Sequence, residues 1–198
     1  MARTNAGLLV VDVQNDFCPG GALAVREGDA IVAVLNQYMG DFFKKQLPIF
    51  ASRDWHPAKT SHFKEFGGLW PVHCVQNTTG AQFHPRLQLP KTVRIISKGM
   101  DPQKDSYSAF QGIDERGVAF EDCLKTLGVK ELFVGGLATD YCVKFSCLDA
   151  VQHGFKVKLL TDAIKGVNIQ PGDSQKAIED MERQGSKKLT YKDFSDGK

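Results

Sequence analysis

The sequence predicts an α/β protein, a three-layer αβα single domain built on a mostly parallel six-stranded sheet. Three observations favour this class. Short, unbroken apolar runs, typical of buried parallel strands, alternate with segments whose apolar residues recur every three or four positions, as on one helix face. The connections between strands are long enough to hold a helix, as parallel pairing requires. No repeat, low-complexity tract or linker interrupts the chain, so we expect one domain over residues 1–198.

The elements of the first half follow from this alternation. The first strand is predicted because Leu8 to Val11 are apolar without a break. The first helix can be capped by Asp29, and its apolar residues share one face. Pro48 occurs only at the start of the second strand, where a missing N–H is tolerated. We expect strands at residues 7–13, 47–53 and 92–97, and a helix at residues 29–45.

The second half repeats the pattern, and glycine and proline mark its boundaries. Gly128 and Gly154 each follow a helical pattern, and Pro171 opens the last one. We expect helices at residues 118–127, 140–153 and 171–184, and strands at residues 131–137, 155–161 and 187–191. Residues 193–198 are predicted to be a frayed tail.

Composition and charge exclude several classes of protein. The chain is 42% hydrophobic and 24% charged, as in ordinary globular proteins. Its 25 basic and 23 acidic residues give a formal charge of +2 with no long basic run, so neither nucleic acid nor a membrane is an expected partner. No apolar run approaches the roughly 18 residues of a membrane span, and no signal peptide is evident. We therefore expect a cytoplasmic protein with free thiols; its oligomeric state stays open, a homo-oligomer included.

Ionisable residues stand where the predicted strands end. Asp12, Asp54 and Lys98 each close a strand, and Cys142 follows the strand at residues 131–137. Parallel strands carry their carboxyl ends to one edge of the sheet, where α/β proteins bind ligands. The long segment at residues 54–90, rich in His, Pro, Gly and aromatic residues, emerges at the same edge. These residues therefore indicate a catalytic crevice.

Cys142 is the candidate nucleophile of this crevice. It lies in the first turn of a predicted helix, where free N–H groups favour a thiolate and can hold an oxyanion. Asp12 is a candidate base if burial raises its pKa, and Lys98 can balance the charge. Each residue also has a plain structural interpretation: a packed thiol, a strand-terminating carboxylate and a solvated lysine. A structural role is expected for the other cysteines, Cys18, Cys74, Cys123 and Cys147.

A second cluster of candidate ligands lies in the segment at residues 54–90. Four of the five histidines fall between residues 56 and 84. One carboxylate with several imidazoles is typical of a mixed nitrogen and oxygen site for Zn²⁺, Fe²⁺ or Mn²⁺. The alternative is a loop with scattered surface histidines. The candidate ligands are Asp54, His56, His62 and His73, with His84 and Glu65 as spare ligands, and His153 is expected to be a surface residue at a helix end.

Six motifs follow one another along the chain: Val11-Asp12-Val13-Gln14-Asn15-Asp16-Phe17, Asp54-Trp55-His56-Pro57, Trp70-Pro71-Val72-His73-Cys74, Lys98-Gly99, Asp105-Ser106-Tyr107-Ser108-Ala109-Phe110 and Gly136-Leu137-Ala138-Thr139-Asp140-Tyr141-Cys142-Val143. In this order they resemble the motifs of the isochorismatase-like cysteine hydrolases and, within them, of the nicotinamidases (pyrazinamidases). The resemblance covers residues 7–165. It implies hydrolysis of nicotinamide, a small-molecule partner, to nicotinate and ammonia in NAD salvage.

The resemblance also implies roles for individual residues. The catalytic triad is Asp12, Lys98 and Cys142. The ligands of one divalent metal ion, Zn²⁺ before Fe²⁺ or Mn²⁺, are Asp54, His56 and His73, completed by His62 or alternatively by Glu65 or water. The substrate-binding residues are Phe17, Trp70, Tyr107 and Leu137. The oxyanion hole is formed by the N–H groups of Ala138 and Cys142, with a cis peptide bond before Ala138.

Three alternative functions would each require a different set of residues. Another isochorismatase-like cysteine hydrolase, acting on a different small amide, would share the triad, but the Asp54, His56 and His73 cluster has no evident role there. A non-catalytic binding module would be expected to lack a member of the triad, and all three are present. A dinucleotide-dependent dehydrogenase is disfavoured because no Gly-x-Gly-x-x-Gly motif follows the first strand.

Overall fold

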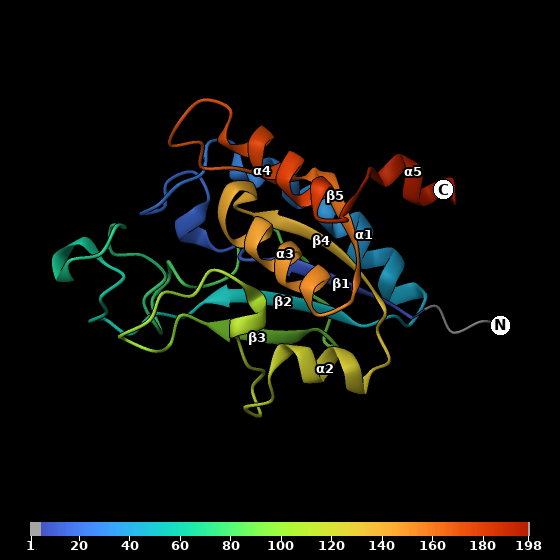
Figure 1. The fold of residues 1–198 in the computed structure, drawn as a ribbon. Coiled ribbons are helices and arrows are strands. Elements are labelled where there is room, and N and C mark those ends of the chain that lie inside the picture. Colours follow the sequence, from blue (N-terminus) through green and yellow to red (C-terminus); the bar gives the residue numbers. More distant parts are fainter. Residues whose placement is uncertain (1–4, 198) are drawn as a thin grey trace.

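Six parallel strands form the central sheet of the computed structural model, which describes residues 5–197 (Figure 1). The strands are β1 (Ala6–Val11), β2 (Ile49–Asp54), β3 (Arg94–Lys98), β4 (Glu131–Leu137), β5 (Lys156–Lys165) and β6 (Lys187–Leu189). Their order in the sheet is β3-β2-β1-β4-β5-β6, and every neighbouring pair is parallel. The predicted fold class is therefore confirmed.

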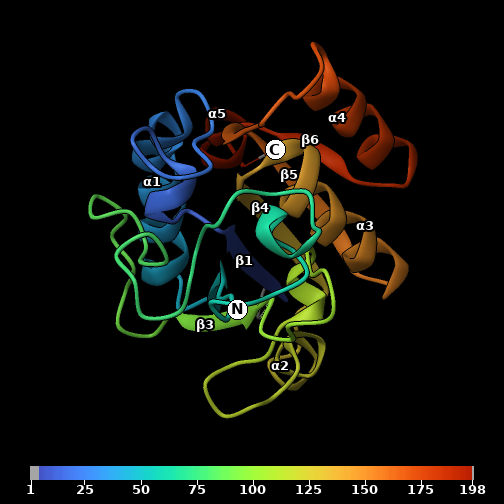
Figure 2. The same ribbon diagram turned by 90° about the vertical axis from the view of Figure 1, so that its left-hand side faces the viewer.

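Helices cover both faces of this sheet (Figure 2). They are α1 (Val32–Lys44), α2 (Phe120–Thr126), α3 (Lys144–Gln152), α4 (Asp173–Arg183) and α5 (Tyr191–Ser195). Side chains of β1 alternate between the two layers: Leu8 and Val10 belong to the core under α1 and α5, and Leu9 and Val11 to the core under α2, α3 and α4. An unbroken apolar strand is what burial on both faces requires.

The order of the strands places a crevice at one end of the sheet. From β1 the chain builds outward through β2 to β3, and then returns to pair β4 with the other side of β1. The crevice therefore lies beyond the carboxyl ends of β1 and β4, where the strand order reverses. Figure 2 looks onto this end, which the loop after β2 overhangs.

Most predicted elements have slightly different bounds in the structure, and three differ markedly. The helix expected at residues 140–153 begins as a π-helix, Thr139–Val143, before α3, and the strand expected to end at residue 161 continues to Lys165. The predicted frayed tail was wrong for its described part, because α5 covers part of the chain's end; Lys198 lies outside the described residues. Phe194 packs on Phe42 and Phe133, with ring centroids 5.8 and 5.7 Å away. This packing of aromatic rings fixes the C-terminal segment, although its local sequence predicts no stable element.

Within residues 5–197, no helix combines the length and the apolar character that crossing a membrane demands.

Candidate active site and metal centre

Four strand ends bring the candidate catalytic residues together. Asp12 directly follows β1, and Asp54 and Lys98, the last residues of β2 and β3, are register partners in the sheet. Cys142 lies in the π-helix that follows β4. All four side chains are buried, with at most 6% of the residue exposed. The interpretation of Lys98 as a solvated surface lysine is therefore contradicted.

The ammonium group of Lys98 is the centre of this cluster. Its Nζ lies 2.9 Å from Asp12 Oδ2 and 3.5 Å from Cys142 Sγ, and it donates a short hydrogen bond to the Asp54 carboxylate. The other oxygen of Asp12, Oδ1, accepts a 2.7 Å hydrogen bond from the hydroxyl of Ser52. One buried cation thus faces two carboxylates and a thiol, an arrangement that local sequence spacing cannot produce.

Burial and neighbouring charges shift the pKa values of these four groups and so decide which of them carry a proton. Burial opposes the charge of Lys98, but Asp12 and Asp54 outweigh it and raise its pKa well above the usual range. Burial likewise opposes the charge of Asp54, yet Lys98 and the neighbouring histidines lower its pKa. For Asp12 and Cys142 burial outweighs the attraction of Lys98, so both pKa values are raised. The resting site therefore holds a charged Lys98–Asp54 pair, a protonated thiol and a carboxyl group whose raised pKa suits a base.

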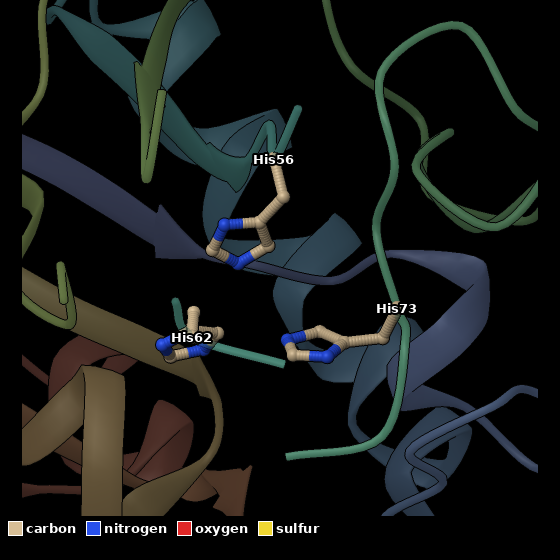
Figure 3. Close-up of side chains that lie close together, drawn as sticks. All are labelled: His56, His62 and His73. Carbon is tan, nitrogen blue, oxygen red and sulfur yellow. The ribbon is translucent and has the colours of Figure 1, made fainter. Parts of the chain in front are cut away.

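Three histidines form a second cluster beside the first. His56, His62 and His73 are buried, their rings point toward a common space (Figure 3), and one nitrogen of each lies within 4.8 Å of the others. Oδ2 of Asp54 lies 3.7 Å from His56 Nε2 and 3.9 Å from His73 Nε2. These histidines are not scattered over the surface.

Hydrogen bonds orient all three imidazole rings. The Nδ1 atom of His56 lies 3.0 Å from the carbonyl oxygen of Gly99, and that of His73 lies 2.7 Å from the carbonyl oxygen of Pro71. Nδ1 of His62 lies 2.6 Å from Asp105 Oδ1. With Nδ1 engaged, Nε2 is the atom left to act as a ligand, as is usual for histidines that bind metals.

This donor set suits a divalent metal ion. Among the described residues, His56 Nε2 is one of the few buried side-chain atoms without a hydrogen-bond partner. Burial lowers the pKa of His62 and lowers that of His73 to about 4, which keeps both imidazoles in the neutral form that a metal requires. Three imidazoles and one carboxylate are ligands typical of zinc.

Two further polar residues, Gln14 and Asp16, hold the backbone of both clusters in place. Neither was a candidate site residue in the sequence. The buried amide of Gln14 accepts a 2.8 Å hydrogen bond from the N–H of Asp54 and donates to the carbonyl oxygens of Asp54 and Ala81 at 2.8 and 2.9 Å. The carboxylate of Asp16 accepts a 2.7 Å hydrogen bond from the N–H of Cys74, next to His73. Polar residues directly after a buried strand were the signal available in the sequence.

A pocket connects the two clusters. Its lining includes Cys142 and Ala138 together with His62, His73 and Asp54. The predicted ring-binding residues also line it, and Trp70 Nε1 donates a 2.9 Å hydrogen bond to the Tyr107 hydroxyl. The predicted residues that line this pocket are Phe17, Trp70 and Tyr107, and the lining residues that sequence reasoning missed are Leu23, Tyr141 and Val167.

Leu137 does not line this pocket. Its side chain is fully buried in the core, and it packs beside Gly28. Side chains alternate across a strand, so the last residue of β4 points into the layer of α1, away from the pocket. The peptide bond that follows, between Leu137 and Ala138, is cis.

The remaining candidates lie apart from the histidine cluster. Glu65 is exposed on a short 3-10 helix, Lys64–Phe66, and His84 is half-buried; neither belongs to the groups of potential ligands found among residues 5–197. His153 follows α3 and pairs with Glu121 at 2.9 Å. All five cysteines are free and buried.

Comparison with known proteins gives the class to which this chain belongs. Residues 6–193 match the family model described as the isochorismatase domain, so the chain is a member of the isochorismatase family. It is 44% identical to the nicotinamidase of Escherichia coli, with 96% of each chain covered. It is 38% identical to the nicotinamidase/pyrazinamidase of Mycobacterium tuberculosis, with 81% of this chain and 87% of that protein covered.

Solved structures extend the likeness to three dimensions. A pyrazinamidase of Pyrococcus horikoshii in complex with zinc is 45% identical, with a TM-score of 0.87 over 94% of this chain and 99% of that one. A protein from L. infantum, PnC1 in complex with nicotinate, is 34% identical, with a TM-score of 0.84 over 96% and 94% of the two chains. An N-carbamoylsarcosine amidase from Thermoplasma acidophilum, 20% identical with a TM-score of 0.75, shares the fold.

Proposed function

We propose that this protein is a metal-containing cysteine amidohydrolase that converts nicotinamide to nicotinate and ammonia, a step of NAD salvage in the cytoplasm. The similar proteins named nicotinamidase support the reaction. The observation that carries the proposal is the pocket, which is lined by the buried thiol of Cys142 and by the imidazoles of His62 and His73. Such a pocket can hold a flat ring by one end and present a carboxamide at the other.

In the first half of the reaction Cys142 is the nucleophile and Asp12 the base. Sγ of Cys142 attacks the carboxamide carbon while its proton passes to Asp12. Lys98 stays charged throughout, which keeps the carboxylate and the developing negative charge tolerable in a buried site. The backbone N–H groups of Ala138 and Cys142 receive the oxyanion, and Asp12 then donates a proton to the departing ammonia.

In the second half the same pair works in reverse. The bond between carbon and nitrogen has broken, and the acyl group is held as a thioester on Cys142. Asp12, again a carboxylate, accepts a proton from a water molecule as that water attacks the thioester carbon. Collapse of the intermediate breaks the bond between carbon and sulfur and returns the proton to the thiolate, so one acid–base pair serves both steps.

The metal site fixes the other end of the substrate. Asp54, His56, His62 and His73 would hold one divalent ion, with Zn²⁺ favoured by the donor set. When bound, the ion supplies a positive charge that a ring nitrogen can coordinate. Phe17, Trp70 and Tyr107 would enclose the ring faces, which keeps the carboxamide directed at Cys142.

Ammonia release tests this function directly. Purified protein loaded with Zn²⁺ is expected to release ammonia from nicotinamide, to lose this activity on chelation, and to regain it when Zn²⁺ is added back. No ammonia from a metal-replete sample would contradict the proposal. The alternative, another isochorismatase-like cysteine hydrolase, predicts release from a different small amide and none from nicotinamide.

A further inference from the structure

The three histidines of the cluster differ in what holds them. His56 and His73 are oriented by carbonyl oxygens of the backbone, from Gly99 and Pro71. His62 is oriented by a side chain, the carboxylate of Asp105, at 2.6 Å. A backbone carbonyl is uncharged and cannot be removed by substitution, whereas a carboxylate carries charge. His62 is therefore the histidine whose strength as a ligand depends on one replaceable residue.

The chemistry of this pair favours metal binding. A carboxylate that accepts the Nδ1–H of an imidazole fixes the tautomer with a free lone pair on Nε2. It also raises the basicity of the ring and so strengthens the bond from Nε2 to a metal. The ring of His62 is buried, with 4% of its side chain exposed, and one of its nitrogens lies within 4.8 Å of a nitrogen of His56 and of His73.

Asp105 is held in place although its side chain is 59% exposed. The next residue, Ser106, accepts a 3.4 Å hydrogen bond from Lys98 Nζ through its carbonyl oxygen. The residue after that, Tyr107, accepts the hydrogen bond of Trp70 through its hydroxyl and donates its N–H to Gln111 Oε1 at 3.0 Å. The segment that carries the carboxylate is thus fixed by the catalytic cluster and by the pocket wall.

We propose that Asp105 is a positioning residue that makes His62 the fourth protein ligand of the metal, an inference that rests on the metal site of the proposed function. Asp105 touches neither substrate nor metal and acts through His62. It follows that Glu65, exposed on its 3-10 helix, is not a ligand in this chain. It also follows that metal affinity falls when Asp105 is replaced, even though both residues of the pair lie outside the catalytic cluster.

Zinc affinity is the measurement that tests this role. The dissociation constant of Zn²⁺ is determined by competition with a chromophoric chelator, without substrate. Asp105→Ala removes the acceptor and is expected to weaken zinc binding by roughly 10- to 100-fold. Asp105→Asn keeps an acceptor oxygen but loses the charge, so its loss is expected to be smaller.

Three control variants separate positioning from a general loss of structure. Asp101→Asn changes another partly exposed acid of the same loop, which pairs with Lys104 at 3.6 Å, and is expected to leave zinc affinity unchanged. Glu65→Gln is expected to leave it unchanged as well. In a His62→Ala background, Asp105→Ala is expected to cause no further loss, because its effect passes through the missing ring.

The outcomes are distinct. Unchanged affinity in Asp105→Ala, or an equal loss with and without His62, would overturn the positioning role while leaving the metal site intact. A loss in Glu65→Gln as large as that in Asp105→Ala would overturn the assignment of His62. A wild-type protein that binds no zinc would overturn the proposed metal site itself, and the inference with it.

Discussion

Two neighbouring clusters at the same end of the sheet differ in whether the chain supplies a cation to its buried polar groups. In the cluster of Asp12, Asp54, Lys98 and Cys142, the protein supplies the cation itself. Asp12, Asp54 and Cys142 offer ligand atoms within 4.8 Å of one another, but the ammonium of Lys98 already contacts all three groups. In the cluster of His56, His62 and His73 the chain supplies only possible ligand atoms, and the proposed metal ion would be the cation.

Asp54 belongs to both clusters and shows why they differ. One oxygen takes the hydrogen bond of Lys98, and the other lies 3.7 and 3.9 Å from Nε2 of His56 and His73. The Lys98 cluster stands on rigid strand ends, where a buried ammonium is fixed by two carboxylates. The histidine cluster stands largely on a loop, where an ion could draw the imidazole ligands together. The Lys98 cluster is therefore complete in the folded chain, whereas the proposed metal ion would complete the histidine cluster.

The largest expected effect comes from removing the sulfur of the complete cluster. Cys142→Ala is expected to lower turnover of nicotinamide by roughly 10⁴-fold or more, because the thioester cannot form. Binding of the ring, measured by calorimetry, is expected to persist. Cys147→Ala, a buried cysteine farther along the same helical segment, serves as the control and is expected to keep turnover. Full activity in Cys142→Ala would place the nucleophile elsewhere.

Removing the ammonium group of Lys98 is expected to destabilise the folded protein. Lys98→Met leaves Asp12 and Asp54 buried without the ammonium group that they both contact, and we expect it to lower the free energy of unfolding by about 3–5 kcal/mol in metal-free protein. Urea denaturation measures this loss. Lys44→Met, at a lysine with 78% of its side chain exposed, is the control, with an expected change within about 0.5 kcal/mol. A change of similar size in both variants would contradict the pairing.

The histidine cluster is expected to gain stability from metal alone. Zinc present at about 100 times its dissociation constant is expected to raise the free energy of unfolding by about 2.7 kcal/mol, since the ion binds the folded chain and not the unfolded one. His56→Ala is expected to abolish most of this gain. If zinc stabilised His56→Ala as much as the wild type, the metal would bind at another site.

The smallest expected effect concerns the pocket wall between the clusters. Tyr107→Phe removes the oxygen that accepts the Trp70 Nε1–H, which leaves that donor without its partner at a loss of about 1 kcal/mol. We expect KM for nicotinamide to rise about fivefold with little change in kcat, because the bond orients the ring and takes no part in the chemistry. A fall in kcat at unchanged KM would assign Tyr107 to the reaction.

Much of the fold was predictable because it depends on local patterns. Unbroken apolar runs such as Leu8 to Val11 predict strands buried on both faces, and a parallel sheet puts the ends of those strands at one edge. That reasoning alone placed Asp12, Asp54, Lys98 and Cys142 near one another. The described part of the tail predicted at residues 193–198 was misjudged, because Phe194 packs on rings of α1 and β4 that are remote in sequence.

The sequence by itself determined the class of fold, the residue types available for the chemistry, and the edge of the sheet to which they come. Only the tertiary structure decided which partner each of them has. The contacts of Lys98 with Asp12 and Cys142, and of His62 with Asp105, join segments more than 40 residues apart. The same holds for the burial of Leu137 and the lining of the pocket by Val167. The periodicity of apolar residues in the sequence predicts which face of its own helix or strand a side chain lies on. Its distance to other groups, its burial and its protonation depend on the residues that other elements place beside it.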